Sequence, residues 1–154
     1  MISLEEPRGV AESLESDGAI AAFEAMLTRH RKSAGVARVH LRDFLAGLPG
    51  GEALVGDAQV VLDELVTNAV THARVPKGRR IGVRFEMVLG HLRLEVHDAS
   101  SEKPAIRRST GLDAESGRGL CLVEALSVEW GFMPRPEGIG KIVWALVGPG
   151  GGAT

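Results

Sequence analysis

The sequence predicts an α+β sandwich in which helices cover one face of a mostly antiparallel sheet. Three observations indicate this fold. The predicted elements are segregated, with helices, then a hairpin, one further helix and a second hairpin. The predicted strands alternate apolar and polar side chains, which is typical of a sheet with one buried face. The 154 residues, 44% hydrophobic and 25% charged, have the size and composition of one globular domain.

Composition excludes several classes of protein. The 18 Lys and Arg residues against 20 Asp and Glu give a net charge of −2, which argues against direct nucleic-acid binding. No apolar run approaches the ~20 residues of a membrane helix, and the start of the sequence lacks a signal-peptide pattern. The single cysteine, Cys121, excludes an internal disulfide and a cysteine-built zinc site. We therefore expect a cytoplasmic protein that does not bind a membrane.

One folded domain, residues 21–147, is predicted between two poorly structured ends. Residues 1–20 carry five acidic side chains and one arginine with few large apolar groups, which predicts a loosely ordered acidic extension. Residues 148–154 read Gly-Pro-Gly-Gly-Gly-Ala-Thr and predict a flexible tail.

The first half of the domain predicts a strand and two helices. Ala22–Arg29 is apolar enough for a short strand, although its pattern also allows a helix. Ser33 is the expected N-cap of a helix that passes Val36 and Val39 and ends near Gly47. Asp57 is the expected cap of a second helix, which continues to about Ala73.

The second half predicts two hairpins around a long loop. Apolar and polar residues alternate from Ile81 to Val96 on both sides of a two-residue break at Gly90-His91. Residues 98–117 show no periodicity, and a loop of that length is often functional. A helix is expected to begin near Gly119. The last two strands are predicted at Val128–Met133 and Lys141–Val147, around a turn at Pro134–Gly140.

The helix Asp57–Ala73 carries a polar stripe at the edge of its apolar face. The residues expected to face the sheet are Ala58, Leu62, Leu65, Val66, Ala69 and Ala73. Glu64, Asn68 and His72 follow one another at i, i+4 and i+8 along one shoulder of that face. The stripe can be an ordinary polar helix edge. Asn is a poor helix former, however, and an amide oxygen beside a carboxylate suits Mg²⁺.

Two further features lie around the long loop. Asp98 ends a predicted strand, where its carboxylate can accept a hydrogen bond from an exocyclic amine or simply begin a turn. Gly117-Arg118-Gly119-Leu120 opens a predicted helix, and free N–H groups at a helix start favour phosphate. Alone, the two glycines are a weak signal and favour a tight loop-to-helix turn.

Together these features resemble the GHKL superfamily of histidine-kinase-like ATPases. Glu64-Leu65-Val66-Thr67-Asn68-Ala69 resembles its N box, Asp98 the aspartate of its first glycine box, and Gly117–Leu120 its second. Residues 98–117 then resemble its ATP lid. Val60–Ala73, Glu115–Leu120, Val123–Leu126 and Gly140–Trp144 are especially similar to the single-domain branch of anti-sigma-factor serine kinases.

The resemblance implies a Bergerat-type α/β sandwich that binds ATP and Mg²⁺. It implies that Asn68 holds Mg²⁺, that Asp98 recognises the adenine amino group and that the Gly117–Leu120 backbone cradles the phosphates. Glu64 would be the general base that takes a proton from a serine of a protein substrate. His72 would reach the phosphates or line the pocket wall. Arg118 would contact the phosphates or remain in solvent.

The sequence departs from the family pattern at two places. The first box usually reads Asp-x-Gly, but this sequence has Asp98-Ala99-Ser100, which removes backbone freedom and adds the Ser100 hydroxyl. A threonine is common in the late strand, and Ile142 stands at the nearest match. Neither change is expected to abolish ATP binding by itself, but together they are expected to weaken it.

Three functions follow from the sequence. The first is an ATP-dependent serine/threonine protein kinase that binds a sigma factor, phosphorylates an anti-anti-sigma protein and thereby regulates transcription. The second keeps the fold without turnover and acts only by binding the sigma factor or its antagonist. The third is another small-molecule enzyme that shares only scattered glycines. The resembled branch often dimerises, so a homodimer is possible.

Overall fold

The computed structural model describes residues 21–72, 80–99, 115–135 and 140–149. The side chains of residues 72 and 115–119 are not described. The predicted acidic extension (1–20), Ser100, Ala73, most of the predicted lid and the last five residues of the predicted tail therefore lie outside the described residues.

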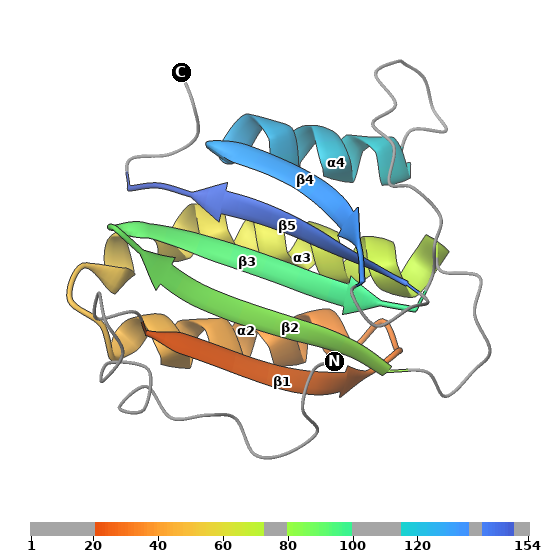
Figure 1. Cartoon of the computed structure of the whole chain (residues 1–154), viewed down its shortest axis with the longest axis horizontal. Helices are drawn as coiled ribbons and strands as arrows, with labels where there is room; N and C mark the ends of the chain where they lie inside the picture. Colours follow the sequence, from red (N-terminus) through yellow and green to blue (C-terminus); the bar gives the residue numbers. More distant parts are fainter. Residues whose placement is uncertain (1–20, 73–79, 100–114, 136–139, 150–154) are drawn as a thin grey trace.

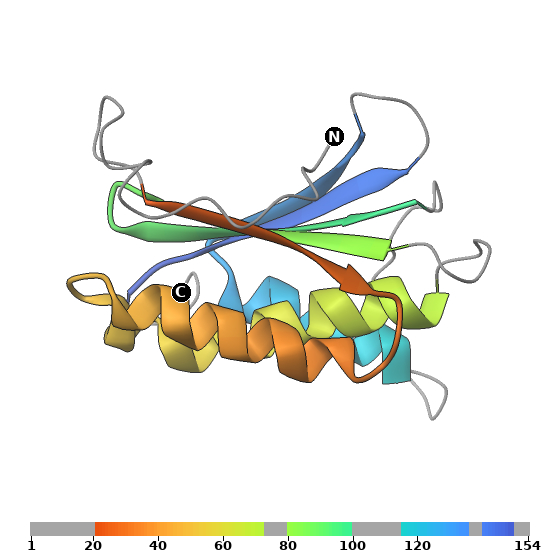
Figure 2. The same cartoon turned by 90° about the horizontal axis from the view of Figure 1, so that it is seen from below.

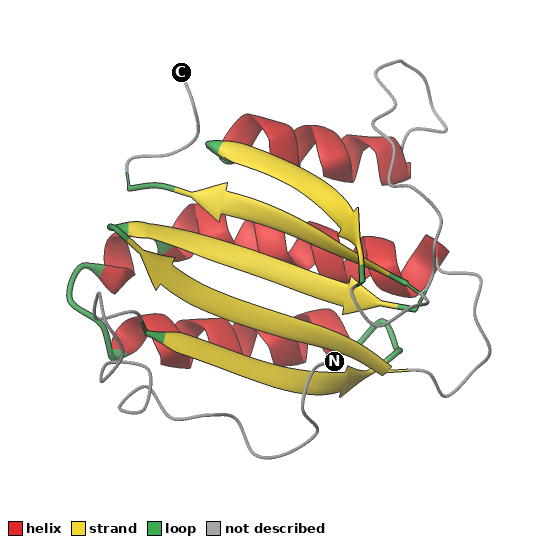
Figure 3. Cartoon of the chain, viewed as in Figure 1, coloured by secondary structure: helices red, strands yellow, loops and turns green. Residues whose placement is uncertain are grey.

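The described elements form an α+β sandwich of two layers (Figure 1), as predicted. Their bounds are β1 Ala22–Thr28, α2 Ser33–Ala46, the 3-10 helix η1 Gly51–Ala53, α3 Val55–His72, β2 Arg80–Val88, β3 His91–Asp98, α4 Glu115–Leu126, β4 Glu129–Pro134 and β5 Lys141–Val147. The strands lie in the order β1-β2-β3-β5-β4, and each of these neighbours pairs antiparallel. Figure 2 shows the helices on one face of the sheet, and Figure 3 shows the two layers by element type.

The hydrophobic core fills the space between the helices and the inner face of the sheet. Inward strand positions are fully buried, among them Val83, Phe85, Leu94 and Val96. Phe23 and Phe85 stack with their ring centroids 5.4 Å apart, which joins β1 to β2 on this side. Among the described helices, none is long and apolar enough to cross a bilayer.

Helix α2 begins where it was predicted, but the expected cap is wrong. Ser33 is the first helical residue, and no side chain caps the helix at the preceding Lys32. The Ser33 hydroxyl instead donates a hydrogen bond to the backbone carbonyl of Thr28, so it ties the helix to the end of β1. Val36 and Val39 lie on the outside of the helix, 47% and 54% exposed.

Helix α3 begins at Val55, two residues before the predicted cap. The backbone N–H of Ala58 donates to the carbonyl of Leu54 at 3.0 Å, so Leu54 precedes the first turn and Asp57 lies within it. The predicted inward face is confirmed by complete or near-complete burial of Ala58, Val61, Leu62, Leu65, Val66 and Ala69. Of these, only Val61 was not predicted.

The β2–β3 turn is shifted by one residue from its predicted place. Leu89 and Gly90 form the turn, with φ of 51° and 82°, while His91 already pairs with Val88. Two successive positive φ angles are typical of the hairpin turn whose twist matches the strands. The first strand is confirmed, and β4 lies one residue later than predicted.

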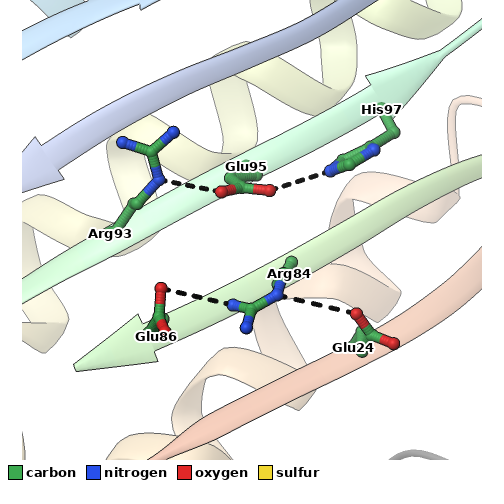
Figure 4. A network of polar contacts seen from close by, with 6 residues as sticks. All are labelled: Glu24, Arg84, Glu86, Arg93, Glu95 and His97. Carbon is green, nitrogen blue, oxygen red and sulfur yellow. Dashed lines mark hydrogen bonds and ion pairs between the residues drawn. The ribbon is translucent and has the colours of Figure 1, made fainter. Parts of the chain in front are cut away.

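The outer face of the sheet carries two rows of paired charges across β1 to β3 (Figure 4). Within β3, Glu95 receives Arg93 Nε at 2.8 Å and His97 Nε2 at 2.9 Å. In the second row, Arg84 lies 3.6 Å from Glu24 and 3.4 Å from Glu86. The charged side chains that alternate with the buried apolar ones therefore pair with one another on the outer face.

Candidate functional site

Glu64 and Asn68, two residues of the predicted polar stripe of α3, lie at the boundary of the core, as predicted. Glu64 and Asn68 are half-buried, while Leu65 and Ala69 beside them are 2% and 4% exposed. The two polar side chains are one helical turn apart on the shoulder of the inward face. His72 ends the helix, and its side chain lies outside the described set.

The environment of Glu64 raises its pKa above the ordinary 4.5. Partial burial is the larger cause, because it disfavours the charged carboxylate, and the negative charge of Asp63 adds to it. Asp63 itself is paired with Arg38 on α2. Within the described part of the chain, no donor hydrogen-bonds the Glu64 carboxylate. Glu64 is therefore a carboxyl group whose proton affinity is increased, as a general base requires.

Asp98 is the last residue of β3 and lies on the inner face of the sheet, 1% exposed. Its carboxylate is close to Lys141, the first residue of β5. Lys141 Nζ donates to Asp98 Oδ1 at 3.2 Å and lies 3.1 Å from Oδ2. Since the two residues are register partners on neighbouring strands, the ion pair is fixed by the sheet itself.

Lys141 is the site residue that the sequence analysis missed, and the expected role of Ile142 is wrong. Ile142 pairs with His97 and therefore points to the outer face, opposite to Asp98. The residue beside Asp98 is Lys141, which is 7% exposed. The available signal was the alternation of β5, in which Lys141 occupies an inward position otherwise taken by Val143, Ala145 and Val147.

Gly140 allows the start of β5 to approach Asp98 this closely. Its φ is +115°, and a Cβ at this position would lie 2.2 Å from the backbone oxygen of Asp98. A side chain is therefore excluded at residue 140 for two independent reasons. Glycine at residue 140 therefore lets the chain before Lys141 lie directly against the backbone of Asp98.

Helix α4 begins at Glu115, four residues before the predicted start near Gly119. Gly117, Arg118, Gly119 and Leu120 consequently lie inside the helix instead of preceding it, which corrects the prediction. Packing of α4 against α3 and β4 offsets the low helix propensity of the two glycines. The N–H groups without an intrahelical acceptor are those of the first turn. Leu120 is 2% exposed and belongs to the core.

The structure brings the predicted segments to one end of the molecule. The carboxyl ends of α3 and β3, the start of β5 and the amino end of α4 all lie at the right of Figure 1, and Figure 2 agrees. Direct packing of α3 against β3, β5 and α4 joins them. Asn68, Asp98 and the first turn of α4 therefore lie on elements that meet at this end, and Glu64 lies one turn further back along α3.

These residues fit Mg²⁺ and the phosphates of a nucleotide, while Lys141 already occupies the predicted nucleobase acceptor. No cluster of three His, Cys, Asp or Glu suited to a metal occurs among the described residues. Mg²⁺ at phosphates commonly takes only one or two protein oxygens, so Asn68 beside Glu64 satisfies that requirement. The amino end of α4 suits phosphate. At the predicted nucleobase position, both carboxylate oxygens of Asp98 already face Lys141.

Comparison with known proteins identifies the family of the chain. No curated protein matches the sequence at a significant level. A family model described as a histidine kinase-like ATPase domain matches residues 23–145, which span every described element from the start of β1 to the middle of β5. The chain belongs to the family of histidine kinase-like ATPase domains.

Proposed function

We propose that this chain is an ATP- and Mg²⁺-dependent serine/threonine protein kinase of the anti-sigma-factor type. It would bind a sigma factor and phosphorylate an anti-anti-sigma protein on serine in the cytoplasm, and two copies would pair as a homodimer. Family membership implies ATP binding, usually with Mg²⁺. The single observation that carries the kinase proposal is Glu64, half-buried, with a raised pKa and one turn from Asn68.

In this mechanism each of the proposed site residues has one task. Asn68 would hold the metal through its amide oxygen, and Asp98 would accept a hydrogen bond from the adenine amino group. The first turn of α4 would orient the phosphates by its N–H groups and helix dipole. Glu64 would take the proton of the substrate serine, since its raised pKa brings it closer to the task of a base near neutral pH. Bound Mg²⁺·ATP supplies the phosphoryl group and neutralises its charge.

A function without turnover is supported by the Asp98–Lys141 ion pair. If Asp98 is permanently engaged by Lys141, the site loses its base acceptor and the domain acts by protein contact alone. His72, Arg118 and Ser100 remain predicted nucleotide contacts in the first proposal and have no role in the second.

Thermal melting with Mg²⁺·ATP separates the two proposals. At a ligand concentration a hundred times Kd, binding adds about 2.7 kcal/mol of stability, and a domain of this size gains roughly 2–4 °C per kcal/mol. A shift of several degrees supports nucleotide binding, and no shift at millimolar Mg²⁺·ATP supports the protein-contact function.

Phosphotransfer then tests the kinase itself. The chain is incubated with γ-labelled ATP and a panel of anti-anti-sigma proteins, and label is sought on serine. Asn68→Ala should weaken both nucleotide binding and transfer. Glu52→Gln is a matched control for Glu64→Gln, because Glu52 is an exposed residue of η1 and both substitutions remove one carboxylate. Nucleotide binding without transfer to any member of the panel contradicts the kinase proposal.

A further inference from the structure

The strongest unexplained feature of the molecule is the lysine that faces the base-recognition carboxylate. Lys141 and Asp98 are 7% and 1% exposed, and the ammonium lies within 3.2 Å of both carboxylate oxygens. A buried ion pair adds little net stability compared with an apolar pair of the same volume. Stability alone is therefore a weak reason for a lysine at an inward position of β5.

The geometry of the pair resembles the contact that a nucleobase would make. An exocyclic amine donates hydrogens to a carboxylate from a distance of about 3 Å. The Lys141 ammonium already makes that contact from inside the protein, held there by the β3–β5 register and by Gly140. A base amine must displace this ammonium or share the carboxylate with it.

We propose that Lys141 is an intramolecular competitor for the base site and a determinant of its specificity. It occupies Asp98 when no nucleotide is bound, so it lowers the affinity for adenine nucleotides. It also weakens discrimination against 6-oxopurines, because the carbonyl oxygen of such a base meets an ammonium instead of a lone carboxylate. The proposal rests on the proposed nucleotide site but needs no phosphotransfer.

Calorimetric titration with Mg²⁺·ADP and Mg²⁺·IDP tests the proposal. ADP carries an exocyclic amine where IDP carries a carbonyl, and neither nucleotide can donate a γ-phosphoryl group. The variants are Lys141→Thr, which opens space and leaves a hydroxyl, and Lys141→Met, which keeps most of the side-chain volume and removes the charge. Lys141→Arg keeps the cation as the matched control. Circular dichroism establishes that each variant is folded.

We expect Lys141→Thr to bind ADP about tenfold more tightly than the wild type, the size expected of a hydrogen bond to a charged group. Its affinity for IDP should not rise, so the ratio of the two dissociation constants should widen about tenfold. Lys141→Met should change in the same direction, and Lys141→Arg should resemble the wild type. Adding Asp98→Asn to Lys141→Thr should abolish the gain.

A folded Lys141→Thr or Lys141→Met protein that binds ADP no better than the wild type overturns the proposal, and so does an equal gain for ADP and IDP. A purely structural lysine would produce one of these results. Because the titration involves no phosphotransfer, its outcome is independent of the kinase proposal. Absence of label transfer with the expected titration would leave Lys141 as a competitor and refute only the kinase.

Discussion

Two partly buried carboxylates of this molecule have pKa values shifted in opposite directions. Glu95, on the outer face of β3, is held by Arg93 and His97, and Glu64, on the shoulder of α3, has no hydrogen bond from the described residues. Burial alone would raise the pKa of Glu95, but hydrogen bonds from His97 and Arg93 and their charges lower it to about 2. Burial and Asp63 raise the pKa of Glu64.

The difference follows from what surrounds each carboxylate in the fold. Donors lie beside Glu95 because every second residue of β3 points to the same face. Glu64 lies beside apolar residues and another acid, so its proton affinity increases. Asp98 is a third case, in which a buried carboxylate forms an ion pair with Lys141 of the neighbouring strand.

The largest expected effect is on Glu64. Glu64→Gln should lower the rate of phosphotransfer by about 10²–10⁴-fold, the usual contribution of a positioned base. Nucleotide affinity should change little, because the Glu64 carboxylate is not proposed to contact the nucleobase or the phosphates. Single-turnover transfer and calorimetry measure the two quantities. Transfer at the wild-type rate would show that Glu64 is not the base.

The next effect concerns the stability of the buried pair. Lys141→Met leaves Asp98 as a buried carboxylate without Lys141, and loss of one partner of a buried pair costs about 3–5 kcal/mol. Arg84→Met on the outer face should cost under about 1 kcal/mol, because its partners remain partly solvated. Urea unfolding of both variants measures the difference. Equal losses of unfolding free energy in the two variants would contradict the expected difference between the buried ion pair and the outer-face ion pairs.

Glu95 should contribute to acid sensitivity. Its pKa is lowered from 4.5 to about 2 in the folded state, so the unfolded chain takes up the proton first as the pH falls. The stabilisation is present above about pH 5 and is lost toward pH 2, with a size of at most about 3 kcal/mol. The difference in unfolding free energy between wild type and Glu95→Gln should therefore shrink from pH 6 to pH 2. A constant difference would contradict the assignment.

The smallest effect should come from Asp63. Asp63→Asn removes a negative charge that raises the pKa of Glu64, so that pKa should fall and the acid limb of the pH–rate profile should move to lower pH. Stability should change by less than about 1 kcal/mol, because the Arg38–Asp63 pair is more than one-third exposed. A shift of the acid limb to higher pH would contradict the Coulombic coupling.

Periodicity in the sequence was sufficient to predict the layers of the fold. The alternation in Ile81–Val96 and the inward face of α3 are both confirmed, because each depends on a repeating pattern of many residues. Boundaries depend on single contacts and were less accurate. The hairpin turn moved by one residue because Leu89 adopts a positive φ, and α4 begins earlier because packing compensates for its glycines.

The candidate site was predicted in part. The spacing of Glu64 and Asn68 placed both on one ridge, since helical geometry fixes that relation locally. The Asp98–Lys141 contact joins residues 43 positions apart, and it depends on strand order and register, which the sequence analysis did not assign. Matching Ile142 to the family pattern placed the expected residue on the wrong face. A shift of one residue along β5 reverses the side to which each side chain points.

The most direct test of this account is a crystal structure of the chain with Mg²⁺ and a non-hydrolysable ATP analogue. We expect the base amine about 3 Å from the Asp98 carboxylate, the metal on the Asn68 oxygen and the phosphates at the start of α4. A nucleotide bound elsewhere on the molecule, or a metal held without Asn68, would contradict the account.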